Sequence, residues 1–141
     1  FKNRDNELYS IMRRLNYIDF YIETNGSIEI TGLDIENSHF VVDWKSPSSN
    51  FEDSFVISNL KKLRFKNDCI KFVVTRTDLN WVKERVNQIQ KTNPFLNLYI
   101  SAQSGKIELN EISDFILRNR LPLKMSIQLH KIVWPHIKRG V

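Results

Sequence analysis

The fold of this chain is decided by residues 69–102, CIKFVVTRTDLNWVKERVNQIQKTNPFLNLYISA. This stretch begins with the apolar run CIKFVVT and ends with the similar run LNLYISA, and both are typical of strands. Between them, apolar residues recur at helical spacing behind a Thr or Asp that can cap a helix. These residues are Trp81, Val82, Val86 and Ile89. A strand, a helix and a second strand in this order predict a crossover unit with two parallel strands.

The same alternation extends toward both ends of the chain. On the N-terminal side, residues 5–16 predict an amphipathic helix, IDFYIE and SHFVVDWK predict strands, and Asn25-Gly26 predicts a turn or loop. A helix face is expected next, formed by Phe55, Val56, Leu60 and Leu63. On the C-terminal side, ELNEISDFILRNR predicts a helix that buries Leu109, Ile112, Ile116 and Leu117, and KMSIQLHKIVW predicts a fifth strand. We therefore expect residues 1–141 to form a single α/β domain with a mainly parallel sheet.

Polar side chains interrupt one face of several predicted strands, whereas strands covered on both faces are nearly continuously hydrophobic. Because side chains alternate across a strand, three polar sets each share a face. These sets are Asp43 with Lys45, Tyr99 with Ser101 and Gln103, and Ser126 with Gln128 and His130. The pattern favours a curved, partial (β/α) barrel whose inner face presents polar groups to a ligand at its C-terminal rim. An open sheet with one wet face is the alternative.

Composition limits the classes of function. A hydrophobic fraction of 41% suits one core, and a net charge of +5 suits either an anionic partner or simple solubility. The basic run Lys61, Lys62, Arg64 and Lys66 is expected on a solvated helix face. Because few aromatic residues lie among these bases, we do not expect direct nucleic-acid binding. The sequence contains no membrane-length apolar run and nothing that resembles a signal peptide, so we expect a cytoplasmic protein without membrane contact.

The sequence lacks the motifs of common hydrolases, kinases, dinucleotide-binding enzymes and zinc proteases. The single cysteine, Cys69, excludes an intrachain disulfide and a multi-cysteine metal site, and we expect it to be a small buried hydrophobe. His39 and His136 are expected in loops or at the surface. His130 is the histidine we expect in a site, because a neutral imidazole offers both a donor and an acceptor.

Two strand ends are further candidates for a site. Lys45 can neutralise a carboxylate or phosphate, with Asp43 holding it in place, although a simple salt bridge explains the spacing equally well. Glu23, Thr24 and Asn25 lie where a strand gives way to a loop, the position at which barrels build their sites. A turn alone explains Asn25-Gly26 but not the whole group.

Five motifs in order resemble the C-terminal two-thirds of the 7-carboxy-7-deazaguanine synthase family, which belongs to the radical S-adenosylmethionine enzymes. They are YIETNGSI, VVDWKSPSS, IKFVVT, YISAQSG and SIQLHKIVWP, followed by a terminal RGV. The resemblance runs from about residue 7 to the end of the chain. This family has a shortened barrel of alternating strands and helices, so the resemblance implies the same partial barrel that the strand pattern favours.

The resemblance implies a carbon–nitrogen lyase with S-adenosylmethionine, a [4Fe-4S] cluster and Mg²⁺ as cofactors. The cluster would cleave S-adenosylmethionine reductively, and the 5′-deoxyadenosyl radical would act on 6-carboxy-5,6,7,8-tetrahydropterin. Ring contraction would give 7-carboxy-7-deazaguanine, which feeds queuosine and archaeosine synthesis and so tRNA modification. A homodimer is also implied.

The same resemblance assigns ligand contacts to particular positions. The implied contacts with S-adenosylmethionine are Asp43, Trp44 and Lys45, together with Ser101, Ala102, Gln103 and Ser104. The implied pterin contacts are Asn25, His130 and the terminal carboxylate of Val141. Without the resemblance, Val141 would be taken for a frayed terminus.

The three-cysteine cluster motif, the Gly-Gly-Glu-Pro motif and the Mg²⁺ ligand of the family are missing from this sequence. We therefore expect the cluster-binding part to precede Phe1 in a longer polypeptide, and these 141 residues alone to be inactive. The alternatives are another radical S-adenosylmethionine enzyme, such as a glycyl-radical activating enzyme, a basic RNA-binding module, and a natural truncated homologue with a new role.

Overall fold

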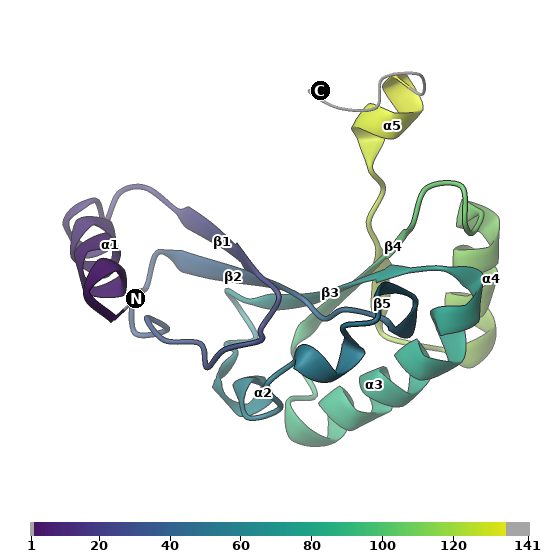
Figure 1. Cartoon of the computed structure of the whole chain (residues 1–141), viewed down its shortest axis with the longest axis horizontal. Coiled ribbons are helices and arrows are strands. Elements are labelled where there is room, and N and C mark those ends of the chain that lie inside the picture. The colour runs from purple at the N-terminus through teal and green to yellow at the C-terminus, as the bar shows by residue number, and fades with distance from the viewer. Residues whose placement is uncertain (1, 135–141) are drawn as a thin grey trace.

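The structure, a computed structural model, describes residues 2–134, and the side chains from residue 7 onward except that of His130. Its helices and strands follow one another in near-regular alternation (Figure 1). In chain order they are α1 (Lys2–Arg14), β1 (Phe20–Thr24), β2 (Ser38–Asp43), α2 (Asn59–Lys62), β3 (Cys69–Val74), α3 (Leu79–Thr92), β4 (Asn97–Ala102), α4 (Leu109–Asn119), β5 (Leu123–Met125) and α5 (Leu129–Val133). Three short 3-10 turns, η1 (Pro47–Ser49), η2 (Glu52–Ser54) and η3 (Arg76–Asp78), complete the described elements.

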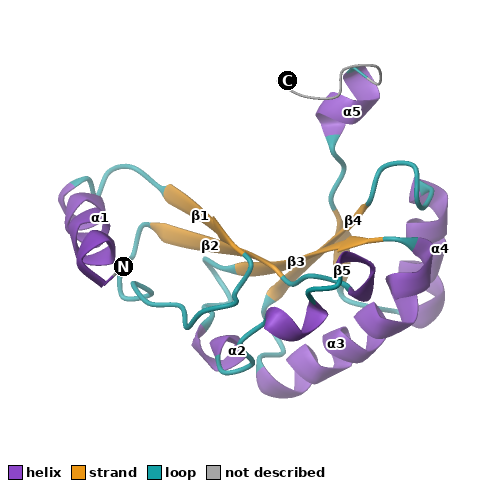
Figure 2. Ribbon diagram, in the orientation of Figure 1, coloured by secondary structure: helices purple, strands orange, loops and turns teal. Residues whose placement is uncertain are grey.

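The five strands form one sheet in the order β1-β2-β3-β4-β5, and every neighbouring pair is parallel. The sheet is twisted, with α2, α3 and α4 on one side of it and α1 near the β1 end (Figure 2). The predicted α/β class with a parallel sheet is therefore confirmed. The predicted barrel is not, because β1 and β5 are the open edges of the sheet within the described part of the chain.

The core lies between the sheet and the helices. Alternate residues of β3, namely Ile70, Phe72 and Val74, have no exposed surface and meet the buried face of α3. That face consists of Val82, Val86 and Ile89, with Trp81 packed beside it. The helical periodicity read from residues 69–102 is thereby confirmed, and it makes α3 the main cover of the central strands.

The predicted buried side of α4 is only partly confirmed. Ile112 is fully buried and Ile116 packs against the core, but Leu117 is 71% exposed. At 100° per residue, Leu117 lies about 140° around the helix from Ile112, whereas Phe115 and Ile116 flank Ile112 closely. Phe115 therefore takes the place in the core that was predicted for Leu117.

The helix predicted across Phe55, Val56, Leu60 and Leu63 is wrong in its first part. Phe55 has extended backbone angles between η2 and the four-residue helix α2. Its ring stacks on Trp44 at 4.1 Å between centroids, and the backbone N–H of Val56 donates to Gly26 O at 2.9 Å. These long-range contacts give Phe55 and Val56 packing and backbone hydrogen-bond partners without a helix, and Phe55, Leu60 and Leu63 are still buried.

The predicted fifth strand is also wrong beyond its first residues. Strand β5 ends at Met125, residues 126–128 have no regular structure, and α5 begins at Leu129. The last sheet contact is the N–H of Ser126, which donates to Ile100 O at 2.8 Å. An edge strand has one neighbour only, and with Met125 opposite Ile100, β4 offers partners no further than Ile127. A strand that continued to Trp134, as predicted, would therefore leave most of its backbone unpaired.

Candidate functional site

A hollow of about 410 Å³ lies at the C-terminal edge of the sheet, on the face opposite α3. It is lined at the end of β1 by Glu23, Thr24 and Asn25, at the end of β2 by Asp43 and Lys45, and on β3 by Lys71. Burial alternates along β2 and β3, so this face is half-exposed where the other is buried. We call it the open face. The two strand ends that the sequence singled out therefore meet at one place.

Asp43 and Lys45 form an ion pair within this hollow. Lys45 Nζ donates to Asp43 Oδ2 at 2.5 Å. The side chain of Lys45 is 37% exposed and that of Asp43 is 29% exposed. The other carboxylate oxygen, Asp43 Oδ1, is buried and accepts no hydrogen bond from any residue that the structure describes. A buried acceptor without a donor is costly, so a ligand hydroxyl or amine would fit beside it.

Trp44 lies between these two residues in sequence but on the opposite face of the sheet. Only 2% of it is exposed, and its ring packs against Phe55 and, edge-on, against Trp81. Its indole N–H donates to Glu52 O at 3.3 Å. The side chain therefore fixes the end of β2 to the core and does not line the hollow, because neighbouring residues point to opposite faces.

The loop after β1 is held in a defined conformation. Gly26 is buried with φ +67°, and a Cβ there would come within 2.8 Å of the Phe55 ring and 2.9 Å of Val42 Cγ1. Only glycine meets both conditions without strain. Asn25-Gly26, predicted as a turn or loop, thus lies in a loop, and exposed Asn25 lies at the rim of the hollow, with its Oδ1 accepting from Ser27 N at 3.1 Å.

Asn59, which the sequence analysis missed, secures the same loop from α2. Its side chain is fully buried, donates to the carbonyls of Gly26 and Ile28 at 3.2 and 3.0 Å, and accepts from Ile30 N at 2.9 Å. A polar residue inside an apolar helix face was the available signal, since a buried amide must find partners. These partners come from more than 28 residues away, which sequence spacing does not show.

The second predicted contact with S-adenosylmethionine lies at the end of β4. Ser101 is fully buried and its hydroxyl has no partner among the described residues, while Gln103 and Ser104 are exposed. Ala102 and Ser104 line a separate cavity of about 180 Å³, which Gln128 also borders with a buried, unpartnered Oε1. The two predicted contact groups thus share the C-terminal edge of the sheet but line different cavities.

The predicted pterin contacts are placed less completely. The backbone of His130 lies in α5, not in a strand, so the expected shared face of Ser126, Gln128 and His130 is not formed. The side chain of His130 and the whole of His136 and Val141 lie outside the part of the chain that the structure describes. Asn25 is the one predicted pterin contact whose side chain is described.

Cys69 begins β3 on the open face and is half-buried, not fully enclosed as expected. Burial raises the pKa of its thiol, and Asp68 adds to that rise, while Lys71 and Lys124 partly oppose it. His39 was expected in a loop or at the surface; it lies in β2 and is half-buried, where it stacks on Tyr21 and contacts Asn67 O and Asp19. The contacts described for Cys69 and His39 are thus with neighbouring residues of the fold.

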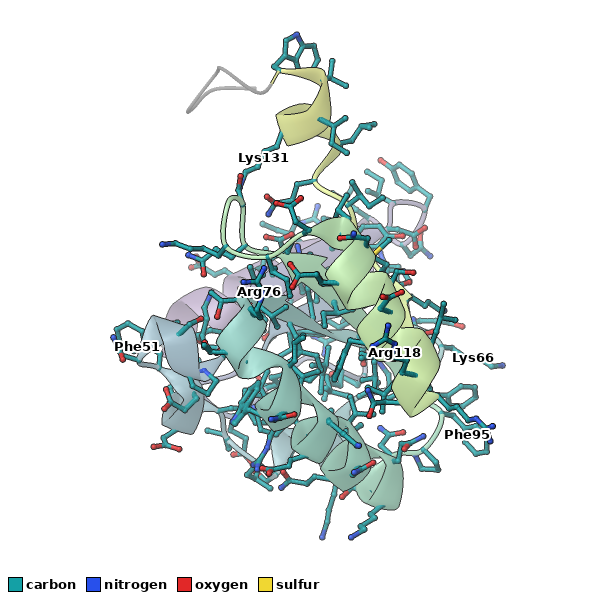
Figure 3. The ribbon with its side chains drawn as sticks, turned by 90° about the vertical axis from the view of Figure 1, so that its right-hand side faces the viewer. Phe51, Lys66, Arg76, Phe95, Arg118 and Lys131 are labelled. Carbon is teal, nitrogen blue, oxygen red and sulfur yellow. The ribbon has the colours of Figure 1, made fainter. Side chains whose placement is uncertain are left out.

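The basic run does not form the expected solvated helix face. Lys62 pairs with Glu29 at 2.6 Å, and Arg64 lies beyond α2 and binds Asp68 and several carbonyls. Lys66 points outward at another edge, beside Phe95 (Figure 3). The charges of the basic run are thus divided among ion pairs and separate surfaces, an arrangement that does not favour a nucleic-acid interface. None of the described helices has the length and apolar character needed to cross a membrane.

An α/β fold with polar groups gathered at the C-terminal edge of a parallel sheet defines a class of ligand-binding proteins and enzymes. No protein-family model matches this sequence. Individual known proteins are similar to it. The chain is 37% identical, over 96% of its length, to the 7-carboxy-7-deazaguanine synthase of Clostridium acetobutylicum. It is 33% identical, over 93% of its length, to that of Leptospira interrogans. The synthase of Chlorobaculum tepidum is 27% identical over 85% of the chain.

These comparisons confirm the resemblance found in the motifs. The similarity extends over most of the chain, and all three relatives carry the same name, 7-carboxy-7-deazaguanine synthase. The chain spans 62%, 56% and 55% of the lengths of these three relatives. It therefore matches somewhat more than half of each synthase.

Proposed function

We propose that this chain is part of a 7-carboxy-7-deazaguanine synthase and that its open face binds S-adenosylmethionine and a carboxylated pterin. The observation that carries the proposal is the similarity to named synthases over 93–96% of the chain in two relatives at or above 33% identity. The hollow at the end of β1 and β2 supports it, because residues that the resemblance assigns to both ligands border it.

The residues of the open face fit the polar part of S-adenosylmethionine. Asp43 Oδ1 and Ser101 Oγ are both buried and unpartnered among the described residues, so each has hydrogen-bonding capacity to offer. The ribose hydroxyls and the amino group of S-adenosylmethionine can donate to the carboxylate oxygen of Asp43. When bound, S-adenosylmethionine would supply the radical chemistry that the resemblance implies. The role of Asp43, Lys45 and Ser101 would be to hold and orient it.

A [4Fe-4S] cluster does not fit the residues present. It is bound by cysteine thiolates, and this sequence contains only Cys69. Among the residues that the structure describes, no three His, Cys, Asp or Glu side chains gather in a way that could hold a metal ion. In the proposed enzyme the ligands of the cluster and of Mg²⁺ would therefore lie outside these residues.

The test is turnover by the full-length protein, expressed from its natural coding sequence and reconstituted anaerobically with iron and sulfide. With S-adenosylmethionine, Mg²⁺ and a reductant, it should convert 6-carboxy-5,6,7,8-tetrahydropterin into 7-carboxy-7-deazaguanine, detected by mass spectrometry. Cluster absorption and iron content serve as the control for correct assembly. An intact cluster without product would refute the proposal.

The same preparation separates the proposal from a glycyl-radical activating enzyme. A synthase should cleave S-adenosylmethionine faster when the carboxylated pterin is added, since that pterin is its substrate. With a glycyl-radical activating enzyme, the pterin would not change the rate of S-adenosylmethionine cleavage, and the radical would be transferred to a protein. No described contact favours that second activity.

A further inference from the structure

Lys71 is a lysine of the open face whose charge is not neutralised by any carboxylate that the structure describes. It lies on β3 in register with Asp43 of β2, the position from which cross-strand ion pairs usually form. Yet Asp43 pairs with Lys45, and no salt bridge joins Lys71 to a carboxylate in the part of the chain that the structure describes. The side chain is half-buried and lines the 410 Å³ hollow.

The charge balance of the hollow leaves Lys71 as its available cation. Asp43 and Lys45 neutralise each other at 2.5 Å, and the remaining carboxylate, Glu23, is exposed on β1, two strands away from Lys71. Two strand spacings separate their backbones by about 9.6 Å, and no ion pair joins Glu23 to Lys71 among the described residues. The half-buried side chain brings an ammonium group without a described counter-charge to the hollow, and an anion bound there can pair with it.

Lys124 shows what the same residue type does elsewhere on the open face. It is aligned with Tyr99, which is itself aligned with Lys71, so the three residues lie side by side across β3, β4 and β5. Lys124 Nζ donates to Asn97 Oδ1 at 2.7 Å and lies 5.6 Å from the centre of the Tyr99 ring. Lys124 is thus engaged by its neighbours and lies outside the hollow, whereas Lys71 faces into it.

We infer that Lys71 is a further ligand-binding residue, which forms an ion pair with a ligand carboxylate in this hollow. The inference rests on the proposed function, in which both ligands, S-adenosylmethionine and the 6-carboxypterin, carry a carboxylate. An ammonium group acts as a compact charge with three rotatable donors, and it can follow a carboxylate that approaches from the rim. Lys71 is not one of the positions that the resemblance assigns.

The experiment compares each ligand with the same molecule lacking its carboxylate. Binding of S-adenosylmethionine, decarboxylated S-adenosylmethionine, 6-carboxytetrahydropterin and tetrahydropterin is measured by calorimetry on the reconstituted full-length protein and on Lys71→Met. One carboxylated ligand should lose about tenfold to a hundredfold in affinity, and its decarboxylated counterpart should be unaffected. The ligand that shows the loss is the one Lys71 contacts.

Two further variants provide the controls. Lys71→Arg keeps the charge and should retain most of the affinity, whereas Lys124→Met removes an equal charge from the same face and should change nothing. Thermal melting checks that all variants are folded. If Lys71→Met weakens both members of a pair equally, or neither, the inference is overturned while the proposed function stands. If the wild-type protein assembles its cluster but neither binds these ligands nor forms product, the proposed function fails and the inference fails with it.

Discussion

Two aspartates at opposite edges of the sheet are bonded very differently. Asp68 precedes β3 at the N-terminal edge, and both its oxygens are saturated: Oδ1 accepts from Phe40 N at 3.0 Å and from Arg64 Nη2 at 2.8 Å, and Oδ2 accepts from Arg64 N and Nε at 2.7 and 2.9 Å. Asp43 ends β2 at the C-terminal edge and has one lysine partner and one unpartnered, buried oxygen.

The guanidinium of Arg64 extends the N-terminal network further. It donates to the carbonyls of Leu33 and Ile35 and to both oxygens of Ser38, and thereby ties the loop before β2 to the loop before β3. At the C-terminal edge Asp78, which follows β3, is likewise bonded through both oxygens, to Ser48 and Thr75. Asp43, Ser101 and Gln128, however, keep unpartnered buried atoms at this edge among the described residues. The difference between Asp68 and Asp43 indicates that the N-terminal edge is bonded within the fold, while the C-terminal edge also retains polar groups for a ligand.

The largest effect is expected at the N-terminal edge. Asp68→Ala should lower the free energy of unfolding by about 3–5 kcal/mol, because it leaves a partly buried guanidinium and the Phe40 N–H without their acceptor. Urea unfolding followed by circular dichroism measures the loss. A loss below about 1 kcal/mol would mean that the network contributes little to stability.

A matched pair of substitutions in β3 compares the two faces of the sheet directly. Val74 is fully buried under α3, and its neighbour Val73 is half-buried on the open face. Val74→Ala should destabilise the protein by about 2–3 kcal/mol, since it removes two buried carbons and leaves a cavity, while Val73→Ala should cost less than about 1 kcal/mol. Equal losses in urea unfolding would show that the open face is packed as tightly as the core.

The reverse behaviour is expected of Asp43. Asp43→Asn keeps an acceptor for Lys45 and removes a partly exposed charge, so the free energy of unfolding should change by less than about 1 kcal/mol. Binding of S-adenosylmethionine should nevertheless weaken by about tenfold or more, because a charged acceptor is lost from the hollow. Calorimetry alongside urea unfolding separates the two effects. Unchanged affinity would place S-adenosylmethionine away from Asp43.

The smallest effect concerns an exposed pair that joins the start of α3 to α4. The hydrogen bonds from Arg76 to Glu111, at 2.6 and 2.7 Å, together with the N–H of Glu108 lower the pKa of Glu111 to about 2. Arg76 belongs to η3, just before α3, and is labelled in Figure 3. Because the folded-state pKa lies below the unfolded value of 4.5, the pair stabilises the protein above pH 4.5 and loses this effect as pH falls toward 2.

Arg76→Gln should therefore lower the melting temperature slightly at pH 6, and the difference from the wild type should vanish near pH 2. Melting curves at pH 6, 4, 3 and 2 measure this convergence. Lys83→Gln, which removes an exposed charge on α3 that hydrogen-bonds Asn119, should show no such dependence on pH. A difference that persisted at pH 2 would point to a packing role for Arg76.

The strands and helices that pack through regular periodicity were predictable. The apolar residues of α3 and the alternating burial of β2, β3 and the first four residues of β4 follow from spacings of about 3.6 and 2 residues, which the sequence displays locally. The placement of Asp43 and Lys45 together at a strand end follows from the same alternation. The predicted burial of Leu117 was wrong, because apolar character alone does not say which side of α4 meets the sheet.

Features that depend on distant partners were not predictable. The length of β5 depends on where β4 ends, and the extended backbone at Phe55 depends on Trp44 and Gly26. The role of Arg64 depends on carbonyls of residues 33–38, so its basic neighbours in sequence gave a misleading signal. Nonlocal hydrogen bonds of this kind leave no periodic trace.

The sequence by itself determined the order of strands and helices as far as β5, their parallel pairing, the loop at Asn25-Gly26 and the resemblance to a family of synthases. The tertiary structure alone decided that Trp44 belongs to the core, that Asn59 holds the loop beside the hollow, and that Lys71 has no carboxylate partner among the described residues. The physical reason is that local periodicity records which face a side chain takes, whereas its partners are set by segments that meet only when the sheet is assembled.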